Sequence, residues 1–169
     1  MTSDQWVKEV LFMHKVTPFL WFNDNGEEAM NFYVSVVPNS KVLDRSSWGE
    51  GGPVPPGGMM VGEFELDGQP VQILNGGPHY KLNEAFSFSI KCKDQDEIDN
   101  YWNALTSGGE EGQCGWLKDK FGVSWQVVPI QLQELLGGDD PEGAGRVVAA
   151  FMQMKKFDIA ALERAYRGE

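Results

Sequence analysis

The amino-acid sequence predicts an α+β fold in which two tandem βαβββ modules form a curved mixed sheet around a central cleft, followed by extra C-terminal helices. The main observation is an internal duplication: a helix-start pattern at residues 25–28 recurs at residues 94–97, and a glycine turn follows each copy, at Gly68 and Gly122. Each half has one helix to cover one face of its strands, so the other face needs a second layer. Concave, partly polar surfaces between modules are common sites for small ligands.

The first module is predicted at residues 16–80, after an N-terminal extension at residues 1–15. Asn25 is suited to cap a helix that carries Glu28 at its third helical position, and apolar residues follow at helical spacing. The pair Asp67-Gly68 is a strong signal for a two-residue hairpin. The expected segments, in order, are a short helix at 2–14, a strand at 16–22, the helix that Pro38 ends, a strand at 40–48, an exposed loop at 49–58, and strands at 59–66 and 69–74.

The second module is predicted at residues 81–129. Residues 85–92, AFSFSIKC, alternate between apolar and polar types as a half-buried strand does. Asp94 and Glu97 then repeat the capping pattern of the first module. Residues 110–129 complete the half as a β-hairpin whose second strand is largely buried.

Residues 130–169 are predicted as a helical C-terminal extension outside the duplication. Cap signals occur at Asp140, which a proline follows, and at Asp158. Met152 and Met154 are expected in the core. These helices are expected to cover either the sheet or a partner subunit.

Composition and charge exclude several classes of function. The formal net charge is −11 and lysine and arginine do not cluster, so a nucleic-acid partner is not expected. No apolar run approaches the roughly 20 residues of a membrane span, and the N-terminus lacks a signal-peptide layout. Cys92 and Cys114 have no CxxC spacing, which indicates neither a disulfide framework nor a zinc site. The expected location is the reducing cytoplasm, with no membrane partner.

Alternation along the strands assigns side chains to the face that the helix leaves open. Gln126 is an amide within an apolar strand, and an unpaired buried amide costs about 1–3 kcal/mol. Gln72 has the same place in the first half, where the hairpin pairs it with Glu63. Trp116 and Trp125 are expected to pair across the second hairpin on the covered face. The predicted ligand-cleft residues are Thr17, Phe19, Trp21, Glu63, Gln72, Ser87, Ser89, Gln126 and, from the connector after the first hairpin, His79.

Five segments carry a resemblance to a known family. They are TPFLWF at 17–22, EAMNFY at 28–33, FELDGQ at 64–69, NGGPH at 75–79 and GQCGWLKDKFGVSWQ at 112–126. They are similar to the PhnB-like group of the vicinal-oxygen-chelate superfamily, which includes glyoxalase I, extradiol dioxygenases and bleomycin-resistance proteins. The group is often labelled 3-demethylubiquinone-9 3-methyltransferase. The resemblance spans about residues 16–165 and implies the duplicated βαβββ fold.

The resemblance also implies where a metal site would lie. In metal-using members of the superfamily, the ligands come from the first and last strands of each module. The matching positions here are Thr17, Gln72, Ser87 and Gln126, none of which is a histidine or a carboxylate. Because hydroxyls and amides bind divalent metals weakly, no metal and no cofactor are expected.

The leading hypothesis is therefore a homodimeric small-molecule-binding protein without a standard metal site, whose catalytic residues, if it has any, are unknown. One alternative is a metal-dependent lyase, isomerase or dioxygenase that recruits Glu63 and His79 as ligands. Another is the methyltransferase of the family label, which is disfavoured because the glycine runs at 49–58 and 107–115 are loops without a strand–GxGxxG–helix pattern. For Gln72 and Gln126, bonding to each other or to strand edges across the module interface is as consistent with the sequence as binding a ligand. A purely structural role built on the C-terminal helices also stays open.

Overall fold

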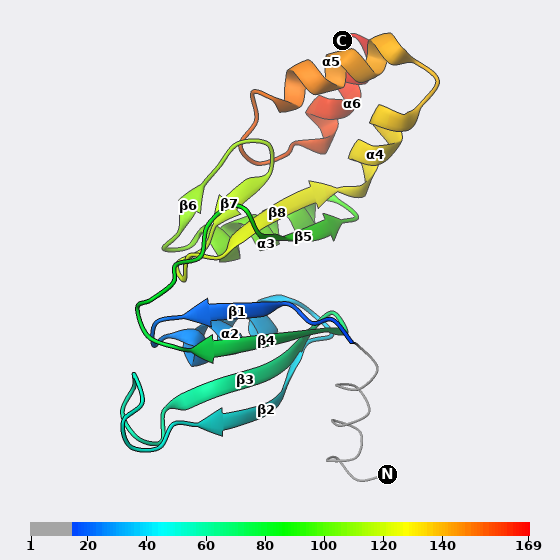
Figure 1. Cartoon of the computed structure of the whole chain (residues 1–169). Helices are drawn as coiled ribbons and strands as arrows, with labels where there is room; N and C mark the ends of the chain where they lie inside the picture. Colours follow the sequence, from blue (N-terminus) through cyan, green and yellow to red (C-terminus); the bar gives the residue numbers. More distant parts are fainter. Residues whose placement is uncertain (1–14) are drawn as a thin grey trace, which may run out of the picture. The chain divides into compact units, whose positions relative to one another are not determined.

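The structure is a computed structural model that describes residues 15–169, so the short helix expected at residues 2–14 lies outside the described residues. The strands form two four-stranded mixed sheets, one in each of two compact units that divide after Leu82 (Figure 1). The strand orders are β1-β4-β3-β2 and β5-β8-β7-β6, which is one arrangement built twice. The duplicated α+β fold predicted from the sequence is confirmed, whereas a cleft shared by the modules stays a prediction.

The first unit follows the expected order of strand, helix and three strands. β1 pairs in parallel with β4, and β4 and β2 both pair antiparallel with β3. A parallel first strand requires a crossover, and the helix supplies it. The elements are β1 (Phe19–Phe22), α2 (Gly26–Val36), β2 (Lys41–Ser47), β3 (Met59–Leu66) and β4 (Gln69–Asn75).

One face of this sheet is covered by α2. Met30 and Tyr33 of the helix are fully buried, and the Tyr33 ring stacks on Phe64 of β3 with the centroids 6.4 Å apart. Val71 and Ile73 of β4 are buried on the same face. Because side chains alternate along a strand, the residues between them lie on the other face. The sheet therefore presents an open face that includes Glu63 and Gln72.

The start of α2 differs from the sequence prediction. Asn25 occupies the N-cap position, but its side chain makes no capping hydrogen bond. Instead, the Gly26 backbone N–H donates to Oδ1 of Asn75 at 2.8 Å. Asn75 is 2 % exposed and ends β4, so the cap comes from a strand far away in the sequence. The side-chain cap expected from Asn25 is wrong. The acceptor at the start of the helix is Asn75, which a tertiary contact brings there.

The hairpin turn at Asp67-Gly68 is confirmed. Both residues have positive φ, 47° and 77°, as a two-residue turn of this twist requires. The turn sets the register of β3 against β4, so Glu63 lies directly opposite Gln72.

The second unit repeats the arrangement. Asp94 caps α3 by accepting a hydrogen bond from the Glu97 backbone N–H at 2.9 Å, as predicted. The helix buries Ile98, Trp102 and Leu105 against the sheet. The elements are β5 (Ser87–Cys92), α3 (Gln95–Thr106), β6 (Glu110–Glu111), β7 (Trp116–Lys118) and β8 (Ser124–Pro129).

The two tryptophans of this hairpin lie on opposite faces, so the expected Trp116–Trp125 pair is wrong. Leu117 is the residue opposite Trp125, and Trp116 lies opposite Gln126. Trp125 is 1 % exposed and packs on Phe88, with the ring centroids 4.9 Å apart. A one-residue difference in register moves a side chain to the other face of a sheet. Trp116 therefore shares the open face with Gln126.

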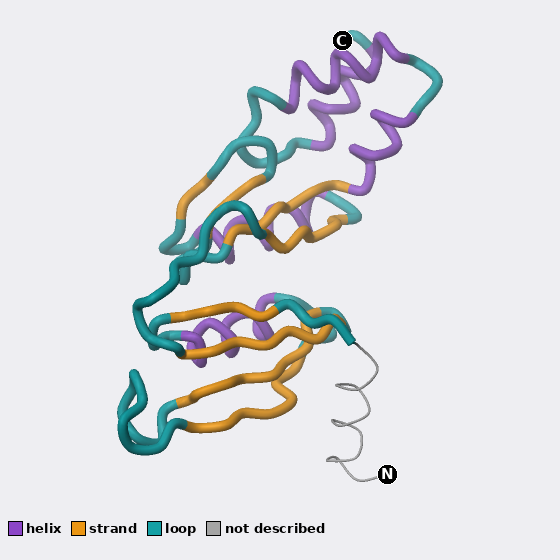
Figure 2. The backbone as a smooth tube through the Cα atoms, viewed as in Figure 1, coloured by secondary structure: helices purple, strands orange, loops and turns teal. Residues whose placement is uncertain are grey.

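The C-terminal extension forms three helices that belong to the second unit (Figure 2). Asp140 and Asp158 cap the second and third of them, as predicted. Met152 is 55 % exposed, so its expected place in the core is wrong. None of the helices within residues 15–169 is long and apolar enough to cross a membrane. The helices are α4 (Ile130–Gly137), α5 (Pro141–Phe151) and α6 (Ile159–Arg167).

The thiol of Cys92 is expected to be unreactive in the folded protein. Its side chain is fully buried at the end of β5, and burial, reinforced by the charges of Glu97 and Asp94, raises the pKa of the thiol to about 12. The thiolate, which is the reactive form, is then scarce at neutral pH. Mass spectrometry after iodoacetamide treatment at pH 8 is expected to find Cys92 unmodified until urea unfolds the chain. Modification under native conditions at the rate of a free thiol would contradict this prediction.

Candidate functional site

The open face of the first sheet carries a paired acid and amide. Gln72 Nε2 donates a hydrogen bond to Glu63 Oε1 at 2.8 Å, joining β4 to β3. The second carboxylate oxygen, Glu63 Oε2, is buried and has no hydrogen-bond partner within residues 15–169. Phe19 of β1 lies beside Gln72 in register and is 51 % exposed. Acid, amide and exposed aromatic ring are thus neighbours on one surface.

The structure places the other predicted residues of this unit in β1, just before it, and in the connector after β4. Trp21 is held in place, because its Nε1 donates to the Gly77 carbonyl oxygen at 2.9 Å and its ring meets Tyr80 edge-on at 5.0 Å. Thr17 is half-buried just before β1. His79 is exposed in the connector and makes no hydrogen bond within the described residues. Sequence reasoning missed Tyr80, although an aromatic residue two positions after a glycine–proline pair was a usable signal.

The open face of the second sheet has a related pair. Gln126 Nε2 donates to Ser87 Oγ at 2.9 Å. Ser89 is exposed and lies next to Gln126 in register, with Trp116 on the other side. Each glutamine therefore bonds a side chain of a neighbouring strand within its own sheet. In Gln126, as in Gln72, the amide nitrogen is engaged.

Sequence reasoning missed a second polar group on this face. Ser124 lies opposite Ser87, is 2 % exposed, and its Oγ has no hydrogen-bond partner within the described residues. Lys118 is the next residue across and forms an ion pair with Glu84. Lys118 Nζ also donates a hydrogen bond to the Glu84 carboxylate. This bond lowers the pKa of the Glu84 carboxyl and raises the pKa of the lysine. The ion pair lines a small hollow of about 130 Å³ beside Ser124.

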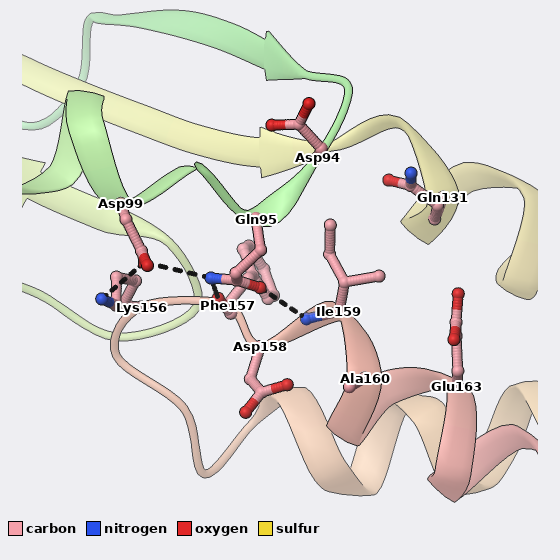
Figure 3. A pocket seen from close by; sticks show the side chains of 10 residues that line it. All are labelled: Asp94, Gln95, Asp99, Gln131, Lys156, Phe157, Asp158, Ile159, Ala160 and Glu163. Atoms are coloured by element: carbon pink, nitrogen blue, oxygen red, sulfur yellow. Dashed lines mark hydrogen bonds and ion pairs between the residues drawn. The ribbon is translucent and has the colours of Figure 1, made fainter. Parts of the chain in front are cut away.

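A larger pocket, of about 670 Å³, lies where α3, the first turn of α4 and the start of α6 meet (Figure 3). Gln95 lies at its centre: its Nε2 donates to Asp99 Oδ1 at 3.1 Å and to the Phe157 carbonyl oxygen at 3.0 Å, and its Oε1 accepts from the Ile159 backbone N–H at 3.0 Å. Lys156 Nζ pairs with Asp99 at 2.6 Å, which lowers the pKa of that carboxyl. The polar groups at the centre are hydrogen-bonded or ion-paired with one another. We interpret this pocket as the joint, that is, the contact that attaches α6 to α3.

Replacing Gln95 by leucine is expected to loosen that joint. The change removes three hydrogen bonds at once and leaves the Phe157 carbonyl and the Ile159 N–H without their partner, for a loss of about 2 kcal/mol. Hydrogen exchange followed by mass spectrometry is expected to show faster exchange at Ile159 and along α6. Gln153→Leu is the matched control, because that glutamine is exposed and its side chain makes no hydrogen bond within the described residues. Equal exchange in both variants would contradict the assignment.

The fold and this site define a class of protein. Two βαβββ modules, each with a parallel first strand beside its last strand and a polar residue of that last strand on the open face, are the arrangement of the vicinal-oxygen-chelate superfamily. Residues 14–128 match the sequence model of the family described as 3-demethylubiquinone-9 3-methyltransferase, and the chain belongs to that family. No curated protein matches the chain.

Solved structures of other proteins are similar to this chain in fold. The PhnB protein from Bacillus cereus, described under the same family name, is 32 % identical, with a TM-score of 0.64 over 69 % of this chain and 99 % of that one. A protein from Pseudomonas aeruginosa is 21 % identical, with a TM-score of 0.57 over 69 % and 97 % of the two chains. The fosfomycin resistance protein FosX from Listeria monocytogenes, complexed with Mn(II) and sulfate, is 15 % identical, with a TM-score of 0.51 over 73 % and 95 %. The last two share the fold.

The residues present here do not fit a metal of the kind bound in FosX. Within residues 15–169 no group of three histidine, cysteine or carboxylate side chains comes together. Of the positions that the superfamily resemblance marks, Gln72 is bonded to Glu63 and Gln126 to Ser87. Amides and hydroxyls are poor ligands for divalent cations compared with imidazole and carboxylate. The acid that contacts one of these positions in the first sheet is Glu63, through its bond with Gln72.

Proposed function

We propose that this chain binds small organic molecules on the open faces of its sheets, through amide, hydroxyl and carboxylate groups rather than through a metal. The observation that carries the proposal is Glu63 Oε2, a buried carboxylate oxygen without a hydrogen-bond partner within the described residues. Leaving such an acceptor unpaired costs about 1–3 kcal/mol or more, so a ligand that donates to it gains binding energy. Gln72 fixes the carboxylate through the other oxygen.

The neighbouring groups describe the ligand further. Phe19 is half exposed beside Gln72 and offers an aromatic surface on which an apolar ring packs. On the second sheet, taken by itself, Ser89 and Gln126 offer hydroxyl and amide oxygens. The ligand class that suits the groups of the first sheet is an aromatic molecule with an N–H or O–H donor for Glu63. We also propose that the protein acts as a homodimer in the cytoplasm.

The test uses benzamide and 4-hydroxybenzamide as probes, followed by NMR of the glutamine side-chain amides. We expect saturable shifts at Gln72, and about tenfold weaker binding in Glu63→Gln, because that change places an N–H₂ donor where the ligand's donor must approach. Glu50→Gln is the matched control: it removes the same charge from an exposed loop. If neither probe shifts Gln72, or if both variants bind equally, the proposal is wrong.

Two alternatives are decided by parallel titrations. Tight stoichiometric binding of Mn²⁺ or Zn²⁺ that Glu63→Gln abolishes would favour a metal-dependent lyase, isomerase or dioxygenase, the alternative that the Mn(II) complex of FosX motivates. Micromolar binding of adenosylmethionine would favour the methyl transfer in the family description. The glycine-rich segment 49–58 is a loop between β2 and β3 and is not followed by a helix. This disfavours the methyltransferase hypothesis.

A further inference from the structure

A groove of about 560 Å³ lies where the open face of the second sheet meets α4. Its volume is within the range of small-molecule sites, and its walls are mainly apolar. Val128 and Lys91 are paired in register at the end of β8 and β5, one step along the same face from Gln126 and Ser89. The groove therefore lies next to Ser89 and Gln126 of the candidate site, on the same face of the second sheet. The residues that shape it are Lys91, Val128, Ile130, Leu132, Gln133 and Leu136.

The far wall of the groove is α4, which has an unusual environment. Half of its eight residues are isoleucine or leucine, yet none of its residues is buried, and Ile130 and Leu136 are 44 % and 38 % exposed. The helix is attached at its start, where Gln131 Nε2 donates to the Lys93 carbonyl oxygen at 2.7 Å. The family match ends at residue 128, so this wall is supplied by the part of the chain beyond it. The groove is a feature that the matched family region does not by itself provide.

Lys91 is the charged group of the groove. It is exposed and makes no ion pair within residues 15–169, in a chain whose net charge is −11. Other lysines of the same unit are paired with acids: Lys93 with Glu97, Lys118 with Glu84, Lys155 with Glu111 and Lys156 with Asp99. A lysine that is left unpaired beside an apolar groove complements a ligand with an anionic end and an apolar body.

We propose that this groove binds the apolar body of an amphipathic carboxylate, whose anionic group pairs with Lys91 and lies beside Ser89 and Gln126. The inference rests on the proposed function, binding on an open sheet face, and gives a ligand class to the face of the second sheet. The apolar body gains by leaving water against Val128, Leu132 and Leu136. The C-terminal extension thereby selects the ligand.

The charge is tested with decanoate and the uncharged 1-decanol, titrated into the full chain and followed by NMR. Decanoate is expected to bind more tightly than 1-decanol. Lys91→Met is expected to weaken decanoate about fivefold, as for an exposed ion pair, and to leave 1-decanol unchanged. Lys81→Met is the control, because Lys81 is also exposed and unpaired within the described residues but lies in the first unit. Equal loss in the two variants, or equal affinity for the two probes, would overturn the role of Lys91.

The apolar wall is tested with Leu136→Gln against Val148→Gln. Both residues are exposed on helices, 38 % and 41 %, but only Leu136 lines the groove. Leu136→Gln is expected to weaken both probes about fivefold to tenfold, and Val148→Gln to change neither. If decanoate does not bind and Leu136→Gln instead dissociates a dimer in sedimentation experiments, the groove is covered by a second copy and the proposal is wrong.

The location of the shifts separates this inference from the proposed function. Decanoate is expected to shift the backbone amides of α4 and the Gln126 side chain together. If the aromatic amide probes shift Gln72 but decanoate leaves α4 unshifted, the proposed function stands and the groove inference falls. If decanoate shifts α4 without Gln126, the groove is separate from the open face and the inference as stated is wrong.

Discussion

Replacing Asp119 by alanine is expected to destabilise the second unit by about 4 kcal/mol or more. The side chain is 3 % exposed at the β7–β8 turn. Its Oδ1 accepts from the backbone N–H groups of Phe121 and Val123 at 2.9 and 3.0 Å, and its Oδ2 accepts from Trp125 Nε1 at 2.8 Å. Alanine leaves these donors without their acceptor, and each unsatisfied buried group costs about 1–3 kcal/mol. A loss of this size approaches the whole stability of a small unit.

The measurement is urea unfolding followed by tryptophan fluorescence, with hydrogen exchange at the Val123 amide as a local readout. Asp119→Asn gives a folded comparison: it keeps the shape and one oxygen acceptor but presents N–H₂ where either the turn amides or Trp125 donates. We expect it to lose about half as much. Asp139→Ala, a change at an exposed acid before α5, controls for the loss of charge. A loss below about 1 kcal/mol in Asp119→Ala would contradict this account.

This network explains the long motif at residues 112–126 in physical terms. Asp119 shapes the turn, Gly122 takes the positive φ of 88° that the turn needs, and Trp125 fills the core beneath it. With Trp125 fixed on the covered face, alternation places Gln126 on the open face. The motif thus positions one residue of the candidate site, Gln126, while the other three residues stabilise the fold. A motif of this kind identifies a family by its scaffold more than by its chemistry.

The features that local sequence determines were predictable. The Asp67-Gly68 turn, the caps at Asp94, Asp140 and Asp158, and the equivalence of Gln72 and Gln126 each depend on residues a few positions apart. The pairing of Glu63 with Gln72 followed from turn length alone. Alternation then gave the open faces correctly for β1, where Leu20 and Phe22 are each 3 % exposed and Phe19 is not buried.

Features that depend on distant contacts were not predictable. The cap of α2 comes from Asn75, which no local pattern links to Gly26. The face of Trp116 depends on the register of a three-residue strand, where one residue decides the outcome. The helical pattern that placed Met152 in the core correctly predicted α5, but the helix ends at Phe151 and Met152, just beyond it, is exposed. The hydrogen-bond partners of Glu63 and Gln126 were likewise matters of geometry.

Replacing Gly115 by alanine is expected to separate the C-terminal extension from the second sheet. The Gly115 N–H donates to the Lys155 carbonyl oxygen at 2.7 Å, and its own carbonyl accepts from the Val127 N–H at 2.8 Å. A Cβ at this position would lie 2.4 Å from Cε2 of Phe157 and 2.7 Å from the backbone oxygen of Val127. Phe157 is 2 % exposed and the other neighbour is backbone, so neither moves aside cheaply. The residue also has a φ of 79°, which disfavours a side chain.

Gly122→Ala separates the two costs, because Gly122 has a φ of 88° and no atom within 4 Å of the added Cβ. That control is expected to lose about 1–2 kcal/mol from backbone conformation alone. Gly115→Ala is expected to lose about 3–4 kcal/mol, since the overlap adds a packing cost to the same backbone cost. Urea unfolding gives the totals, and hydrogen exchange at Gln95, Cys114 and Ile159 reports whether the extension detaches. If the two variants unfold at the same urea concentration, Phe157 yields to the new methyl group and the extension is attached elsewhere.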